Sequence, residues 1–255
     1  MPVIDTLKKI KRMLDRAVEI YDEDKHRRAQ YPDFEQAHLD TLELVRPYTM
    51  TSPERVHALI EAVRYITRRR VPGAIVECGV WRGGSMMAAA RTLQALGSTE
   101  RDLYLFDTFE GMSPPTDLDV DMGGRRAATV LAASSKADAA SYWCYASLED
   151  VQAALGKVGY PAERLHYVRG KVEETVPAQA PSQIALLRLD TDWYESTRHE
   201  LEHLYPRLAP GGVLIVDDYG HWKGSRKATD EFIAATPGFG MLTRIDYTGR
   251  LVVKP

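Results

Sequence analysis

Hydrophobic positions follow two different periods along this chain. Residues 4–18 place apolar side chains three or four positions apart, with lysines and arginines between them, which predicts an amphipathic helix. A second helix is predicted to begin after Ser52, because serine is a favoured N-cap residue and Pro53 suits the first helical position. From residue 73 onward, short apolar runs alternate with helical patterns. This alternation predicts an α/β fold with a mostly parallel sheet and helices on both faces.

The expected elements can be placed by residue range. Apolar runs predict strands over 74–80, 102–109, 164–170, 184–190 and 212–218. Helical patterns are found over 84–96, 194–208 and 225–235. The last two runs, 241–249 and 250–255, predict an antiparallel hairpin at the end of the sheet.

Two regions fall outside this alternation. Residues 1–70 are expected to form an N-terminal helical extension that serves as a lid or an assembly element. Residues 71–255 are expected to form the core, with an insertion over 111–145. An irregular insertion of that length is usually a lid, a binding loop or an assembly element.

Polar residues follow the predicted strands at the point where each strand ends. They are Glu77, Asp107, Gly170, Asp190 and the pair Asp217-Asp218. Ligands of mostly parallel sheets bind beyond the carboxyl ends of the strands, so these residues are expected to meet at one rim.

Composition narrows the classes of function. The 255 residues are 44% hydrophobic and 27% charged, as in a globular protein, and the net charge of −3 lacks the footprint of a nucleic-acid binder. The two cysteines do not suggest a disulfide framework or a cysteine metal site. No apolar segment reaches membrane-spanning length, and the first residues show no signal-peptide pattern. We therefore expect a cytoplasmic protein with a small-molecule partner and neither a nucleic acid nor a membrane.

The stretch ECGVWRGGS, from Glu77 to Ser85, predicts a strand, a glycine turn and a helix start that face a ligand. It departs from the dinucleotide pattern G-x-G-x-x-G, because the second glycine is missing where a pyrophosphate would pass. Asp107, about 30 residues later, is placed to accept hydrogen bonds from ribose hydroxyls. A nucleoside without a pyrophosphate points to S-adenosyl-L-methionine, whose ammonium group Glu77 would face.

Three acids suggest a metal site. Asp190 precedes Asp217 by 27 residues, which fits one strand–helix–strand unit and places both on neighbouring strands. Together with Asp218 they would repel one another unless a cation neutralised them, and oxygen ligands suit Mg²⁺. Two alternatives stay open: Asp217 or Asp218 caps a helix or pairs with Arg188 or Lys223, and Asp192 caps the helix near Tyr194.

At this point the chain resembles a known family. The stretches VPGAIVECGVWRGGS, LYLFDTFEGM, LLRLDTDWYEST and LAPGGVLIVDDYGHWKGSRKATDEF are similar to the macrocin O-methyltransferase group of metal-dependent sugar O-methyltransferases. The resemblance implies the class I methyltransferase fold, a seven-stranded, mostly parallel sheet with an antiparallel final strand. By motif it implies metal ligands at Asp190, Asp217 and Asp218. It also implies a cofactor site at Thr49, Met50, Glu77, Gly79, Trp81, Gly83, Ser85, Asp107, Thr108, Gly170 and Lys171.

The resemblance also implies a reaction. The methyl group would pass from S-adenosylmethionine to a hydroxyl of a deoxyhexose such as rhamnose, on a natural product, a glycolipid or a nucleotide sugar. Asp190 and His221 are the two candidates for the general base. Tyr142, Trp143, Tyr219 and Trp222 are candidates for an apolar platform under the acceptor. Oligomers are common among relatives, so a homo-oligomer is expected.

Three other functions were weighed. A catechol-type O-methyltransferase uses a similar oxygen metal site. A non-catalytic protein with this fold is disfavoured by the complete trio of acids. A nicotinamide-dependent dehydrogenase is disfavoured by the missing glycine and by the late position of Asp107.

Overall fold

The computed structural model describes residues 29–138 and 141–255. The helix predicted over residues 4–18 lies outside the described residues. The chain divides between Asp40 and Thr41 into two compact units, and the second unit carries the sheet. In the first unit the rings of Tyr31 and Phe34 stack with their centroids 4.7 Å apart.

The second unit is built on a seven-stranded sheet in the order β3-β2-β1-β4-β5-β7-β6. The strands are β1 (Ala74–Cys78), β2 (Leu103–Asp107), β3 (Leu165–Arg169), β4 (Ile184–Leu189), β5 (Leu208–Val216), β6 (Thr243–Arg244) and β7 (Arg250–Val253). Pairs among β1 to β5 are parallel, whereas β7 runs antiparallel to β5 and to β6. The predicted mostly parallel sheet with an antiparallel end is confirmed.

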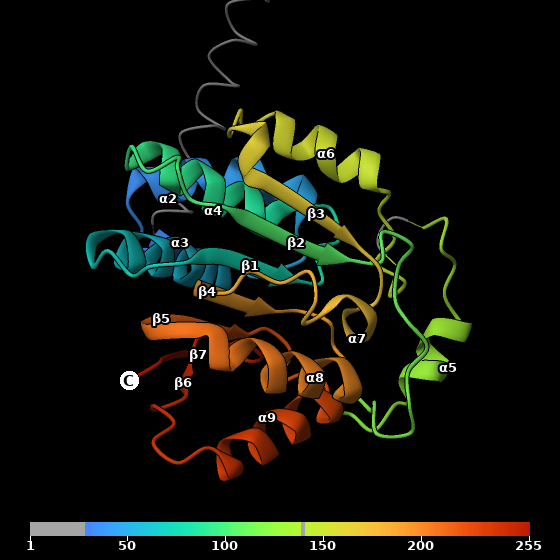
Figure 1. Ribbon diagram of the computed structural model, residues 1–255. Helices are drawn as coiled ribbons and strands as arrows, with labels where there is room; N and C mark the ends of the chain where they lie inside the picture. The colour runs from blue at the N-terminus through green and yellow to red at the C-terminus, as the bar shows by residue number, and fades with distance from the viewer. Residues whose placement is uncertain (1–28, 139–140) are drawn as a thin grey trace, which may run out of the picture. The chain divides into compact units, whose positions relative to one another are not determined.

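The described residues form eight helices, most of which pack on the two faces of the sheet (Figure 1). They are α2 (Gln36–Val45), α3 (Pro53–Arg68), α4 (Gly84–Ala95), α5 (Ala127–Ala132), α6 (Leu148–Gly156), α7 (Val172–Thr175), α8 (Tyr194–Leu204) and α9 (Lys223–Ala235), with short 3₁₀ turns at Arg46–Tyr48, Ala162–Arg164 and Tyr205–Arg207. Among the described residues, no helix is long and apolar enough to cross a membrane.

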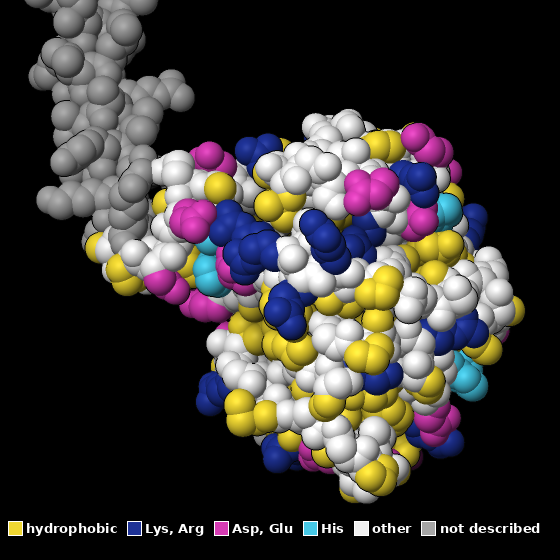
Figure 2. All heavy atoms as spheres, turned by 60° about the vertical axis from the view of Figure 1, so that its left-hand side comes forward, with side chains coloured by type: hydrophobic (Ala, Val, Ile, Leu, Met, Phe, Trp, Pro, Cys, Tyr) yellow, Lys and Arg dark blue, Asp and Glu magenta, His cyan; other side chains and the backbone are white. Residues whose placement is uncertain are grey.

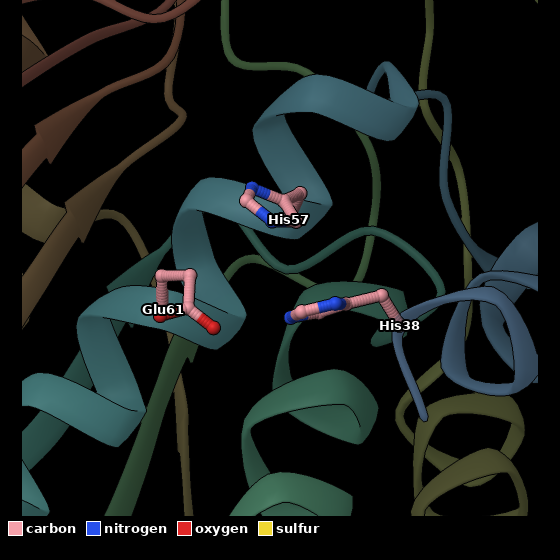
Figure 3. Close-up of side chains that lie close together, drawn as sticks. All are labelled: His38, His57 and Glu61. Atoms are coloured by element: carbon pink, nitrogen blue, oxygen red, sulfur yellow. The ribbon is translucent and has the colours of Figure 1, made fainter. Parts of the chain in front are cut away.

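Helix α3 begins where the sequence predicts. The Ser52 hydroxyl accepts a hydrogen bond from the Arg55 N–H at 3.2 Å, and Pro53 occupies the first turn. Its apolar residues pack with β4 and β5 and against α4, so the structure groups α3 with the sheet. His57 and Glu61 lie four positions apart on another face of α3 (Figure 3).

Two apolar cores lie on the two faces of the sheet. One core joins side chains of α3, α4 and α6, including Ile66, Met87 and Leu155, which are almost fully buried. The other joins α7 and α8 to the opposite face through residues such as Leu201 and Leu204. Burial on both faces explains why β1 and β4 read as continuous apolar runs.

The run 241–249 forms a much shorter strand than the hydrophobic pattern suggests. Only Thr243 and Arg244 pair with β7, because the chain then turns around Asp246. The Asp246 carboxylate accepts the N–H groups of Thr248 at 2.9 Å and Gly249 at 2.7 Å. The hairpin itself is confirmed.

The two ends of the sheet differ in character. At the ends where the parallel strands begin, Arg68, Arg69 and Arg70 are exposed at the end of α3. Figure 2 turns this side forward and shows a group of Lys and Arg side chains on it. The insertion over 111–145, which contains α5, lies beyond the opposite ends of these strands (Figure 1).

Candidate functional site

A cavity of about 440 Å³ opens at the carboxyl ends of β1 to β5. Most predicted site residues line it: Thr49, Met50, Gly79, Trp81, Ser85, Asp107, Thr108, Gly170, Lys171, Asp190, Asp217, Asp218 and His221. Glu77 and Gly83 are not part of its lining. The topology therefore brings residues from five strands and from the segment before α3 to one place.

The turn after β1 is shaped by its neighbours in the chain. Gly79 has a φ of +81°, and a Cβ there would collide with the carbonyl oxygen of Asp190. Gly83 has a φ of +87°, and its Cβ would lie 2.8 Å from Leu155 Cδ2. These glycines are required by backbone conformation and by packing, whether or not a ligand approaches them.

Asp107 closes the same turn from β2. Its Oδ2 accepts the N–H groups of Val80 at 2.6 Å and Trp81 at 3.1 Å, and its Oδ1 accepts that of Phe109 at 2.7 Å. Burial raises the pKa of Asp107, against the lowering effect of these hydrogen bonds. A carboxylate offers about four lone-pair sites, so Asp107 can still accept a further bond from the cavity.

Glu77 lies beneath the cavity floor and is 1% exposed. Its Oε1 accepts Nη1 of Arg188 at 2.6 Å, while its buried Oε2 has no hydrogen-bond partner among the described residues. Burial raises the pKa of Glu77 to about 7, although the charge of Arg188 opposes this. The indole N–H of Trp81 is likewise buried without a partner among the described residues. The Glu77 oxygen fits a positively charged group of a ligand, whereas the Trp81 N–H fits a hydrogen-bond acceptor.

Asp190, Asp192 and Asp218 form a compact carboxylate group. One oxygen from each lies within 4.8 Å of the others. Burial raises the pKa of Asp190 and Asp218 well above the usual range and that of Asp192 to about 7, and the neighbouring carboxylates add to the rise. A donor set of oxygens alone, under mutual repulsion, fits a hard divalent cation.

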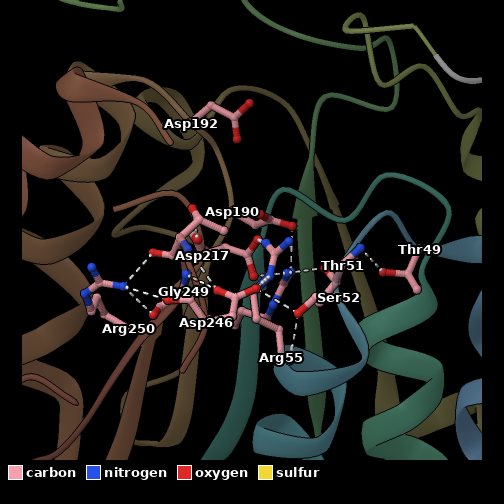
Figure 4. A network of polar contacts seen from close by, with 12 residues as sticks. Thr49, Thr51, Ser52, Arg55, Asp190, Asp192, Asp217, Asp246, Gly249 and Arg250 are labelled. Atoms are coloured by element: carbon pink, nitrogen blue, oxygen red, sulfur yellow. Dashed lines mark hydrogen bonds and ion pairs between the residues drawn. The ribbon is translucent and has the colours of Figure 1, made fainter. Parts of the chain in front are cut away.

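Asp217 lies between two buried arginines. Its carboxylate accepts Nη2 of Arg188 at 2.5 Å and also pairs with Arg55 (Figure 4). Among the described residues it is not part of the compact group of three. The pairing with Arg188, left open as an alternative, is thus formed. Asp192 joins Asp190 and Asp218 in the compact group, and the assignment of Asp190, Asp217 and Asp218 as metal ligands stays a prediction.

Asp192 is available because another residue caps helix α8. The N–H of Tyr194 donates to Asp119 Oδ1 at 2.8 Å, and Asp119 comes from the insertion. The expected cap by Asp192 is therefore not made. Instead, Asp192 Oδ2 accepts the indole N–H of Trp222 at 3.2 Å.

The candidate base His221 lines the cavity and is half-buried. Burial lowers the pKa of His221 from its ordinary value, which favours the neutral imidazole that can accept a proton. Its ring meets that of Trp222 edge to face, with the centroids 5.0 Å apart.

The four candidate platform aromatics divide into two groups. Tyr142 and Trp222 line the cavity. Tyr219 instead lies under the guanidinium groups of Arg226 and Arg250, and Trp143 donates its indole N–H to backbone carbonyls. Only the first pair is placed to contact an acceptor.

Sequence reasoning missed the roles of Arg55 and Asp119, and it named Arg188 only as a possible partner of Asp217 or Asp218. Arg188 stands inside the apolar run of β4, and a charge in such a position signals a buried ion pair. No comparable signal marks Asp119, because its partner lies 75 residues away.

Comparisons with known proteins agree with this geometry. The family model described as Macrocin-O-methyltransferase (TylF) matches residues 5–253. The chain is 35% identical, over 68% of its length and 62% of the relative, to 8-demethyl-8-(2,3-dimethoxy-alpha-L-rhamnosyl)-tetracenomycin-C 4′-O-methyltransferase of Streptomyces olivaceus. It is 33% identical, over 68% of its length and 65% of the relative, to mycinamicin III 3″-O-methyltransferase of Micromonospora griseorubida. The chain thus spans less than two thirds of each of these relatives.

Solved structures share the fold. The O-methyltransferase NovP has a TM-score of 0.71 and 29% identity, over 81% of this chain and 82% of that one. The SAH-bound methyltransferase PaMTH1 of Podospora anserina, with a TM-score of 0.54 over 91% and 96% of the two chains, is only 15% identical and shows the fold alone. The seven-stranded sheet is therefore that of the class I methyltransferases, and the chain belongs to the macrocin O-methyltransferase (TylF) family.

Proposed function

We propose that this protein is an O-methyltransferase that depends on S-adenosylmethionine and Mg²⁺ and methylates a sugar hydroxyl of a glycosylated natural product. Family membership and the activities of the two named relatives support this function. The observation that supports this function most directly is a single cavity whose two sides differ in their polar groups. Trp81 in the lining and Glu77 beneath the floor each have a polar atom on one side that is unpaired among the described residues, and three convergent carboxylates lie on the other side.

On the cofactor side, the residues present fit S-adenosylmethionine. Glu77 Oε2 is the acceptor for the methionyl ammonium group, directly or through a water molecule. Asp107 accepts from the ribose hydroxyls at the end of β2, and the segment Thr49–Met50 lies against the methionine end. The loop Gly170–Lys171 completes this side, as the motifs imply.

On the acceptor side, Asp190, Asp192 and Asp218 would hold the cation. When bound, a divalent cation supplies a Lewis acid that lowers the pKa of a sugar hydroxyl. The proton of that hydroxyl then needs a base within hydrogen-bond reach. Asp190 and His221 stay the candidates from the sequence, and the position of Asp192 adds a third.

The charges of the cavity favour a glycoside over a nucleotide sugar as acceptor. The lining contains six carboxylates and two cationic side chains: Asp107, Glu173, Asp190, Asp192, Asp217, Asp218, Arg55 and Lys171. Arg55 is already paired with Asp217 and Asp246, so little positive charge is left for a diphosphate. Met50, Tyr142 and Tyr247 also line the cavity and are 53%, 44% and 62% exposed, which suits an apolar aglycone.

Methyl transfer from labelled S-adenosylmethionine tests the proposal with a rhamnosyl glycoside, a nucleotide-bound rhamnose and a catechol as acceptors. The glycoside should be the best acceptor, and excess EDTA should abolish its turnover while S-adenosylhomocysteine still binds in calorimetry. Full activity in excess EDTA would contradict the proposed dependence on a divalent cation. A catechol preferred over both sugars would indicate the runner-up activity, and absence of any cofactor binding would indicate a non-catalytic protein.

A further inference from the structure

Arg188 is a cation buried in the middle of the sheet, on β4, and it is 3% exposed. Its Nη1 donates to Glu77 Oε1 at 2.6 Å and to Asp190 Oδ2 at 2.7 Å. A single nitrogen therefore bridges a carboxylate on the cofactor side of the cavity and one on the acceptor side.

The other terminal nitrogen of Arg188 is equally engaged. Nη2 donates to Asp217 Oδ1 at 2.5 Å and to Thr51 Oγ1 at 3.0 Å. Thr51 directly follows the Thr49–Met50 segment, and its backbone N–H donates to the Thr49 side chain, at Oγ1, at 3.1 Å. All four terminal N–H groups of the guanidinium thus have an acceptor.

The surroundings of Arg188 hold this arrangement in place. Asp217, which accepts from Arg188, also pairs with Arg55, and Arg55 Nε donates to Asp246 Oδ2 at 3.1 Å (Figure 4). Cations and carboxylates therefore alternate from Glu77 to Asp246. A lysine could not replace Arg188, because its single ammonium group cannot present a planar fork to several acceptors.

We propose that Arg188 is a positioning residue that orients Glu77 toward the cofactor and Asp190 toward the divalent cation. Both ligands then depend on one side chain that contacts neither of them. This inference rests on the proposed function, since it assigns the cofactor to Glu77 and the cation to Asp190. It predicts that loss of the guanidinium weakens the binding of two chemically unrelated ligands, the cofactor and the cation.

Binding measurements on Arg188→Lys test this without turnover. Calorimetry gives the affinity for S-adenosylhomocysteine, and the paramagnetic signal of free Mn²⁺ gives the affinity for the cation. Each hydrogen bond to a charged group contributes enough that both dissociation constants should rise by about tenfold or more. Arg188→Met should have a larger effect, and the lysine variant decides if the methionine variant does not fold.

The comparison variants make the result specific. Glu77→Gln should weaken S-adenosylhomocysteine more than Mn²⁺, and Asp190→Asn should do the reverse. Arg101→Lys is the matched control, since Arg101 is a partly buried arginine that donates to the carbonyls of Val71 and Gly73, outside the cavity lining. It should leave both affinities unchanged.

Two results would overturn the positioning role while the proposed function stands. One is an Arg188→Lys protein in which either affinity stays within about twofold of the wild type, well below the change expected from a lost charged hydrogen bond. The other is an equal loss in Arg101→Lys, which would reflect general destabilisation. A wild-type protein that binds neither ligand would instead refute the proposed function itself.

Discussion

At the scale of single residues, Asp192 and Asp217 show that the role of a carboxylate depends on the side chains that contact it. Both follow strands at the same rim, and the pattern of the chain does not separate them. Asp217 meets two buried arginines, whereas Asp192 meets two other carboxylates. The rim could be predicted from strand ends and spacing. The division of roles could not, because it depends on partners such as Arg55, 162 residues away from Asp217.

Asp192→Asn tests the carboxylate group directly. The substitution keeps the shape of the side chain and removes a charge that is either a cation ligand or the base, so kcat should fall by about 100-fold or more. Steady-state kinetics at saturating S-adenosylmethionine measures this. Asp117→Asn, at an 87% exposed aspartate of the insertion, is the control. Near-normal activity of Asp192→Asn would show that Asp192 is neither a cation ligand nor the base.

Asp246 gives a prediction about stability and pH. Burial raises its pKa, but hydrogen bonds from the Gly249 N–H and the Ser52 hydroxyl outweigh this, so the pKa is lowered in the folded protein. Such a group stabilises the fold above its unfolded pKa, about 3.9, and this contribution is lost as the pH falls through the folded value. Asp246→Asn should therefore cost about 1–2 kcal/mol near pH 7 in urea unfolding. The difference in unfolding free energy between the variant and the wild type should shrink below about pH 4. A difference that is constant with pH would contradict the stabilising role of the Asp246 charge.

At the scale of elements, features set by neighbouring residues could be predicted from the sequence. Features that depend on distant partners could not. Ser52 and Pro53 predict the start of α3 because a helix cap is a local device. The short strand β6 was not predicted, since hydrophobicity alone does not show that Asp246 turns the chain. The insertion was predicted as irregular, and its fixed attachment to α8 through Asp119 was not.

Asp119→Ala tests this attachment. Asp119 is fully buried and accepts the N–H groups of Tyr194 and Thr116, which the substitution would leave unpaired. We expect a loss of about 2 kcal/mol or more in unfolding free energy, together with reduced activity, because α8 starts beside Asp192. Asp117→Ala, at an 87% exposed aspartate of the same insertion, is the control. Unchanged stability of the Asp119 variant would show that the cap does not contribute.

At the scale of the whole molecule, the cofactor should stabilise the fold. A ligand that binds only the folded state at 100 times its dissociation constant adds about 2.7 kcal/mol. S-adenosylhomocysteine should therefore raise the melting temperature, and NAD⁺ at the same concentration should not. The reverse pattern would favour the dehydrogenase alternative.

The state of assembly is a separate expectation. The predicted amphipathic helix over residues 4–18 has an apolar stripe that suits a partner chain, and a homo-oligomer stays a prediction. Light scattering on the full chain measures the mass in solution. A monomer at micromolar concentration would contradict the expectation.

The contact between Asp119 and helix α9 bears on how such enzymes diversify. Gly224 approaches Asp119 so closely that any side chain at this position would collide with the carboxylate. Asp119 of the insertion therefore packs against α9 only because position 224 is a glycine. A foreign insertion grafted between residues 111 and 145 should be accepted when it retains this aspartate and the core retains the glycine. We expect exchange of this one segment to change acceptor preference, while the carboxylates and the cofactor turn stay unchanged.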